Sequence, residues 1–181
     1  MPPTQRRPTD SVAEPEADQP DKTAGADDTS PEKESPPTPR ISDEQARDLQ
    51  RRLPVREETL GRRDKTRGTW VDDDGQEHDL VSGEADYFEQ VKQFLTDLDI
   101  GPQRGELMVA SHVESKFAMF MRLHGRKHET IVVNQDPCRG KWGCEELIGR
   151  ILPHGSSLTV LGPNDFKQTY PKPPPRGSEQ T

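Results

Sequence analysis

The first 40 residues of the chain contain nine prolines and no Ile, Leu, Phe, Trp or Tyr. A segment of this composition cannot bury enough apolar surface to offset the entropy lost when it becomes ordered. We therefore expect residues 1–61 to form a disordered, acidic, proline-rich region that contains one short charged helix over residues 42–53. Ser42 and Gln45 can form a capping box at the start of that helix. The folded domain is then confined to residues 62–170, and residues 171–181 form a flexible proline-rich tail.

The charge of the chain limits what it can bind. The net charge of −8 divides into −5 over residues 1–61, with 9 basic and 14 acidic side chains, and −3 over residues 62–181, with 16 and 19. A mildly acidic domain is not typical of a general nucleic-acid binder, so a polyanionic substrate would need a local basic patch. The candidate patch consists of Arg122, Arg126, Lys127, Arg139 and Lys141. The alternative is an ordinary solvated surface.

Hydrophobic spacing predicts a layered α/β domain. The sequence indicates a hairpin over residues 66–81, with its turn at Asp73–Gly75, and an amphipathic helix over residues 84–98. A second helix, capped by Ser111 and ended by Gly125, has Val113, Phe117, Phe120 and Met121 as its buried face. Strands are expected at residues 129–133, 157–161 and 166–170, and a third helix begins near Cys144. The sum is an α/β fold in which two helices begin beside the ends of strands.

Two short motifs carry the chemistry. His112-Val113-Glu114 is followed by Pro137-Cys138 and then by Cys144, and these two cysteines are the only thiols in the chain. One imidazole and two thiolates suit Zn²⁺ and leave its fourth position open, as in catalytic zinc sites. Glu114 would then lie beside that position as a proton shuttle. The arrangement is close to the H-x-E and P-C-x-x-C signature of zinc nucleobase deaminases.

One feature departs from that signature: five residues, including two glycines, separate the cysteines instead of two. The thiols could instead be unrelated buried groups, or form a small loop disulfide. A third alternative is a zinc-stapled binding module without catalysis, which would need a fourth protein ligand. His78, His124, His128 and His154 do not lie at a suitable spacing, which favours an open, catalytic site.

The segment GELMVASHVESKFAMFMRLHG, the stretch ETIVVNQDPCRGKWGCEELIGRILPHGSSLTVLGP and the hairpin RGTWVDDDGQEHDLVSG carry a family resemblance. Over residues 62–170 the chain resembles bacterial deaminase toxins related to the double-stranded DNA cytosine deaminase DddA. The resemblance implies a cytidine deaminase-like three-layer sandwich, with a mixed sheet of about five strands and helices on both faces. It also implies that His112, Cys138 and Cys144 are zinc ligands, that Glu114 is the catalytic residue, and that Asn134 contacts the target base. Trp142, between the two cysteines, is a further substrate candidate, with core packing as its alternative.

The same resemblance implies conversion of cytosine to uracil in DNA by the effector domain of an antibacterial toxin, with an immunity protein as a further partner. Single-stranded DNA is slightly favoured over double-stranded DNA, because extracting a base from a duplex needs wedging side chains and few spare aromatics are present. Deamination of RNA or free cytidine is the alternative activity. No apolar run approaches the roughly 20 residues of a membrane span, and no secretory signal is visible. We therefore expect no membrane partner and a cytoplasmic site of action, reached by delivery into a target cell.

Overall fold

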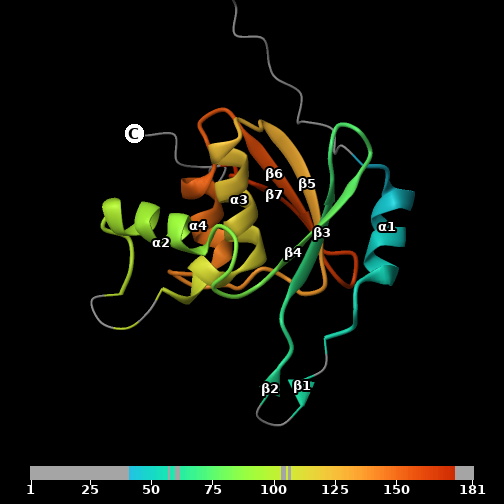
Figure 1. Cartoon of the computed structure of the whole chain (residues 1–181), viewed down its shortest axis with the longest axis horizontal. Helices are drawn as coiled ribbons and strands as arrows, with labels where there is room; N and C mark the ends of the chain where they lie inside the picture. The colour runs from blue at the N-terminus through green and yellow to red at the C-terminus, as the bar shows by residue number, and fades with distance from the viewer. Residues whose placement is uncertain (1–40, 57, 60–61, 103–104, 106, 174–181) are drawn as a thin grey trace, which may run out of the picture. The chain divides into compact units, whose positions relative to one another are not determined.

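The computed structural model describes residues 41–56, 58–59, 62–102, 105 and 107–173. The expectations of disorder over residues 1–40 and of a flexible tail from residue 174 lie outside this range. The described residues form a mixed five-stranded sheet with helices on both of its faces (Figure 1). The predicted α/β sandwich is therefore confirmed.

The central sheet contains both parallel and antiparallel pairs. Its strands are β3 (Arg67–Val71), β4 (Glu77–Val81), β5 (His128–Val133), β6 (Ser157–Leu161) and β7 (Lys167–Tyr170), and their spatial order is β4-β3-β5-β6-β7. Only β5 and β6 are parallel among these neighbours, and helix α4 (Cys144–Ile151) connects them. A separate two-stranded hairpin, β1 (Glu58–Thr59) with β2 (Arg62–Arg63), precedes the sheet and was not expected from the sequence.

Each face of the sheet carries its own hydrophobic cluster, because successive side chains of a strand point to opposite faces. Ile131 and Val133 of β5 pack with helices α2 (Phe88–Asp97), α3 (Val113–Leu123) and α4. Val132 lies in the second cluster, with Leu49 of helix α1 (Asp43–Arg52). In Figure 1, α1 accordingly lies on the side of the sheet opposite to α3 and α4.

Helix α1 begins with the predicted capping box. The hydroxyl of Ser42 accepts a hydrogen bond from the backbone N–H of Gln45 at 3.2 Å, and the Gln45 side chain accepts one from the Ser42 N–H at 3.0 Å. Two N–H groups that the helix itself cannot satisfy are thereby paired.

The packed structure nevertheless begins earlier than the expected boundary at Arg62. Ile41 and Leu49 are only 5% and 3% exposed, and both belong to the cluster around Val132. The prediction failed because it used the average composition of residues 1–61. The first 40 residues lower the average apolar content, so the contribution of Ile41 and Leu49 could not be recognised from it.

Two helix starts differ from the prediction. Helix α2 begins at Phe88 instead of residue 84, because the preceding chain bends and Asp86 has a φ of 55°. Helix α3 is capped by His112 and not by Ser111, whose hydroxyl donates to the carbonyl of Met108 at 2.8 Å within the short 3-10 turn η1 (Met108–Ser111). His112 thus stands at the entrance of α3, outside its first turn.

The end of α3 follows the prediction. Gly125 has a φ of 65°, and the N–H of Arg126 donates to the carbonyl of Met121 at 2.9 Å, as in a Schellman motif. Across the described ranges, none of the helices combines the length and the apolar character that a membrane crossing requires.

Candidate active site

His112, Cys138 and Cys144 meet beside the N-termini of α3 and α4. The Nδ1 atom of His112 lies 3.3 Å from the Sγ of Cys138 and 3.2 Å from the Sγ of Cys144. The three possible ligand atoms lie within 4.8 Å of one another. The two thiols are free, so the alternative of a loop disulfide is not realised.

This donor set fits zinc. Tetrahedral bond lengths of about 2.3 Å to sulfur and 2.0–2.1 Å to nitrogen give nitrogen–sulfur separations of roughly 3.5 Å, so the observed distances need to relax by only a few tenths of an ångström. Within the described part of the chain, no fourth His, Cys, Asp or Glu joins these three as a ligand. The arrangement therefore has the three protein ligands and open position that are typical of catalytic zinc sites.

A tight loop brings the two thiols together despite their wide spacing in the sequence. Cys138 accepts a hydrogen bond at its Sγ from the backbone N–H of Cys144, at 3.1 Å. Gly143 allows this closure, because a Cβ at that position would lie 2.6 Å from the carbonyl oxygen of Cys138. The departure from the two-residue spacing is thus accommodated by a glycine that permits close backbone contact.

The two thiols are unequal. A hydrogen bond from the Cys144 side chain, together with those from His112 and the Cys144 N–H, lowers the pKa of Cys138 to about 4. Burial, together with the hydrogen bond to Cys138 and the charge of Glu114, raises the pKa of Cys144 well above its usual value. Of the two thiols, Cys138 is therefore the one that loses its proton first as the pH rises.

The pKa of His112 reflects opposing effects. Burial lowers it, whereas the hydrogen bond and charge of Cys138 and the charge of Glu114 raise it, and the net shift is upward. Arg56 is close enough for its positive charge to act in the lowering direction.

Glu114 lies in the first turn of α3 and is only 3% exposed. Its Oε2 is 3.7 Å from the Sγ of Cys144, so the carboxyl group stands directly beside the three ligands. Burial raises the pKa of Glu114. A carboxyl group whose pKa is shifted toward neutrality can both accept and donate a proton, as general acid–base catalysis requires.

A cavity of about 310 Å³ opens on His112 and Cys138. Trp142 lines it, and the Nζ of Lys141 lies 4.7 Å from the centre of the Trp142 ring. Trp142 is therefore brought to the metal site, although its contact with a substrate stays a prediction. Sequence reasoning missed Met108, which also lines the cavity and is 64% exposed.

Asn134 is not among the residues that line this cavity. Its Oδ1 accepts a hydrogen bond from the Arg67 N–H at 2.8 Å, and its Nδ2 donates to the Pro54 carbonyl at 2.9 Å. The amide thus ties β3 and the segment after α1 to the end of β5. This is a structural role, and contact of Asn134 with the target base stays a prediction.

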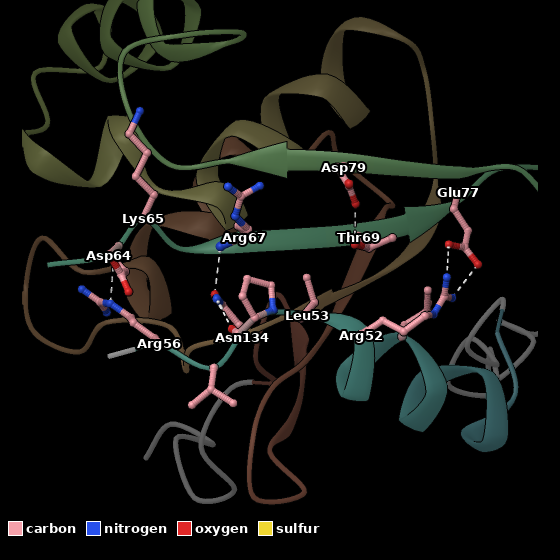
Figure 2. Close-up of a pocket in the computed structure, with 13 residues that line it drawn as sticks. Arg52, Leu53, Arg56, Asp64, Lys65, Arg67, Thr69, Glu77, Asp79 and Asn134 are labelled. Atoms are coloured by element: carbon pink, nitrogen blue, oxygen red, sulfur yellow. Dashed lines mark hydrogen bonds and ion pairs between the residues drawn. The ribbon is translucent and has the colours of Figure 1, made fainter. Parts of the chain in front are cut away.

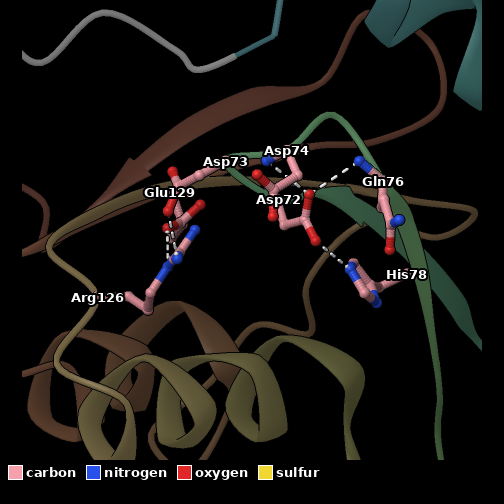
Figure 3. Close-up of polar contacts among 7 residues, drawn as sticks. All are labelled: Asp72, Asp73, Asp74, Gln76, His78, Arg126 and Glu129. Atoms are coloured by element: carbon pink, nitrogen blue, oxygen red, sulfur yellow. Dashed lines mark hydrogen bonds and ion pairs between the residues drawn. The ribbon is translucent and has the colours of Figure 1, made fainter.

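The predicted basic patch does not form as one surface. Figure 3 shows that Arg126 is held between two carboxylates, with its Nε 2.6 Å from Glu129 and a terminal nitrogen 2.7 Å from Asp73. Arg122 donates to the carbonyls of Ile151 and Leu152 at the end of α4.

These arginines and Lys127 follow His112 by ten or more residues, which corresponds to about 15 Å along a helix. Only Arg139 and Lys141 of the expected patch line the cavity beside the metal ligands. All five residues are close to the two motifs in the sequence. In the structure, however, helix α3 lies between His112 and Arg122, Arg126 and Lys127, and separates these three from the metal site.

Figure 3 also explains how the β3–β4 turn is fixed. Asp72 accepts hydrogen bonds from the N–H groups of Asp74 and Gln76, at 3.0 and 2.8 Å, and pairs with His78 at 2.7 Å. His78 is therefore a structural residue of the hairpin, in agreement with its exclusion as a metal ligand.

Comparison with known families adds one finding. The model of the SCP1.201-like deaminase family matches residues 34–171. No curated protein gives a significant match to the chain. The matched range includes α1, all five strands of the sheet, the three possible metal ligands and Glu114.

Proposed function

This chain belongs to the SCP1.201-like deaminase family, and on that premise we propose that it is a zinc-dependent hydrolase that converts cytosine to uracil in DNA. The observation that carries the proposal is the cluster of His112, Cys138 and Cys144 with the buried carboxyl group of Glu114 beside it. An imidazole, two thiols and an adjacent proton carrier are the residue types that zinc nucleobase deaminases use.

His112, Cys138 and Cys144 would hold the zinc ion. When bound, zinc makes a water molecule nucleophilic at neutral pH. Glu114 accepts a proton as water adds to C4 of cytosine. It passes this proton to N3 of the ring, and it then carries the second proton, from the hydroxyl group formed at C4, to the amino group, which leaves as ammonia while C4 becomes a carbonyl. The burial of Glu114 keeps solvent from exchanging that proton during the reaction.

Single-stranded DNA is the substrate we favour. Apart from the metal-ligand candidate His112, Trp142 is the only aromatic residue among the described residues that line the cavity beside the metal ligands. Extracting a cytosine from a duplex costs a few kcal/mol and is helped by side chains that replace the lost stacking. A site with one such side chain is better suited to a base that is already unpaired.

The biological setting is inferred from the resemblance to bacterial toxins. We propose that the domain acts in the cytoplasm of a target cell after delivery into it, and that an immunity protein protects the producing cell. A detectable complex with the product of an adjacent reading frame would support this setting, and harmless expression of the active protein in bacteria without that product would contradict it.

The function is tested by comparing four substrates of matched sequence with the full chain loaded with zinc. These are a single-stranded oligonucleotide, its annealed duplex, the corresponding RNA and free cytidine. We expect mass spectrometry to detect uracil first in the single strand and not after metal removal with a chelator. Faster turnover of RNA or cytidine would identify the alternative substrates. Absence of product from all four, with one zinc bound, would favour a non-catalytic zinc module.

A further inference from the structure

A second, larger cavity lies on the side of the sheet that carries α1. It has a volume of about 750 Å³ and is enclosed by the end of α1, the chain that follows it, and strands β3 and β4 (Figure 2). Its lining is mostly polar: Leu49, Arg52, Leu53, Pro54, Val55, Arg56, Asp64, Lys65, Arg67, Thr69, Glu77, Asp79 and Asn134. The metal ligands and Glu114 do not belong to it.

One end of this cavity is linked to the metal site. Asn134, in its wall, directly follows β5 and precedes the metal-ligand candidate Cys138 by four residues. The N–H of Asn134 donates to the Arg67 carbonyl at 3.0 Å, which fixes the start of β3 against this connection. Arg56 is near enough to His112 for its charge to act on the imidazole. The end of the cavity that carries Arg56 therefore lies toward the metal site, although its lining shares no residue with the cavity beside the metal ligands.

Positive charge collects at one end of the cavity. Figure 2 shows Arg56 and Lys65 at that end, with Arg67 next to them. Lys65 and Arg67 are exposed, and the Nε of Arg56 donates to the backbone carbonyl of Asp64 at 3.0 Å. Among the described residues, none of these three cations forms an ion pair with a carboxylate. Among the lining residues that the structure describes, Asp64 is the one acidic side chain at this end.

The acidic side chains at the other end are already engaged. Glu77 accepts hydrogen bonds from both terminal nitrogens of Arg52, at 2.6 and 2.8 Å. Asp79 accepts one from the hydroxyl of Thr69 at 2.6 Å. Over the described lining residues, four basic side chains stand against three carboxylates, so the cavity carries a small positive charge, concentrated at the end with Arg56, Lys65 and Arg67, in a protein whose net charge is −8.

We propose that this cavity binds the phosphodiester backbone of the DNA strand that carries the target cytosine, with Arg56, Lys65 and Arg67 contacting its phosphates. The proposal rests on the proposed function. Unpaired Lys and Arg side chains beside an active site are suited to phosphate contacts, which position a nucleic acid without reading its sequence. None of the described lining residues is aromatic, so the cavity offers charge and hydrogen bonds but no surface for stacking bases.

The test removes the three charges and compares the result with removal of three charges elsewhere. The variant Arg56→Gln/Lys65→Gln/Arg67→Gln changes the cavity. The control Arg47→Gln/Lys127→Gln/Arg150→Gln removes the same net charge from exposed positions that do not line it. Each is made in the full-length, zinc-loaded chain with Glu114→Ala, so that a fluorescent single-stranded oligonucleotide with one cytosine is bound but not converted. Anisotropy titrations are run at several salt concentrations.

Each phosphate contact on a single strand contributes a slope of about −0.7 in log affinity against log salt, so loss of three contacts should flatten the slope by about 2. At 0.1 M salt this corresponds to weaker binding by on the order of 100-fold. The control should keep both the slope and the affinity. The double variant Lys65→Gln/Arg67→Gln, which changes only exposed side chains, should show about two thirds of the slope change if the triple variant fails to fold.

Equal affinities and slopes for the cavity variants and the control would overturn this inference. The failure of the proposed function has a different signature, because it is read from uracil formation by the chain with Glu114 intact. If that chain forms uracil in DNA while the cavity variants bind normally, the enzyme assignment stands and the strand follows another path.

Discussion

Replacement of Gly143 by Ala tests whether the glycine between the two cysteines builds the metal site. A Cβ at residue 143 would lie 2.6 Å from the carbonyl oxygen of Cys138 and 2.7 Å from the carbonyl group of Arg139. Ordinary contact begins at 3.4 Å, so the backbone that carries Cys138 must move by about 0.8 Å. Metal–ligand distances tolerate changes of only about 0.2 Å. The extra methyl group should therefore disturb zinc binding directly.

Changes in the groups that support metal ligands typically reduce affinity 10–100-fold, and we expect Gly143→Ala to reach at least the upper end, about 100-fold. Overpacking should also cost about 3 kcal/mol of unfolding free energy, the upper part of the usual range, because the contacted atoms belong to the backbone. Zinc affinity is measured by competition with a chromophoric chelator, and stability by urea unfolding.

Gly155→Ala is the matched control. Gly155 has a φ of 71°, and a Cβ added there would have no neighbouring atom within 4 Å, so alanine strains the backbone without contacting the site. It should lower stability by about 1–2 kcal/mol and leave zinc affinity unchanged. Unchanged zinc affinity in Gly143→Ala would refute the reasoning.

Three further predictions concern the core and the thiols. Leu49→Ala should lower the unfolding free energy by about 2–5 kcal/mol if α1 belongs to the packed domain, and a change in urea unfolding below about 0.5 kcal/mol would contradict that packing. Lys116 is fully buried, and its Nζ donates to the carbonyl of Val81 at 2.7 Å. Lys116→Met should therefore lower the unfolding free energy by at least about 2 kcal/mol and speed amide exchange near residues 81–86. Unchanged exchange there would count against this contact. In metal-free protein at pH 6, iodoacetamide should modify Cys138 before Cys144, because a pKa of about 4 makes Cys138 a thiolate at every pH above that value. Peptide mapping that found Cys144 modified first would contradict the order of the two pKa values, and bound zinc should protect both thiols.

The sequence predicted the parts of the fold that depend on local signals. The capping box of Ser42 and Gln45, the glycine end of α3 at Gly125 and the apolar strand β5 all form as expected. The sequence also predicted that His112, Cys138 and Cys144 lie together with Glu114 beside them, because these residue types occur in two short motifs.

Properties that depend on distant partners could not be predicted. Whether Asn134 faces a substrate or the backbone depends on the position of Pro54, 80 residues earlier in the chain. Arg126 looked free for a polyanion until the β3–β4 turn placed Asp73 beside it. The anchoring of α1 depends on Val132, a residue on the opposite face of the strand from the main core.

The central claim is tested most directly by the uracil yield of the zinc-loaded chain and of its Glu114→Gln variant on one single-stranded oligonucleotide. Zinc content is measured in the same samples. We predict one equivalent of zinc in both proteins. Uracil formation by the variant should be slower by about 10²–10⁴-fold, the loss that is typical of a missing acid–base group. Similar uracil yields from both proteins, with zinc bound, would contradict the assignment of Glu114 as the proton carrier.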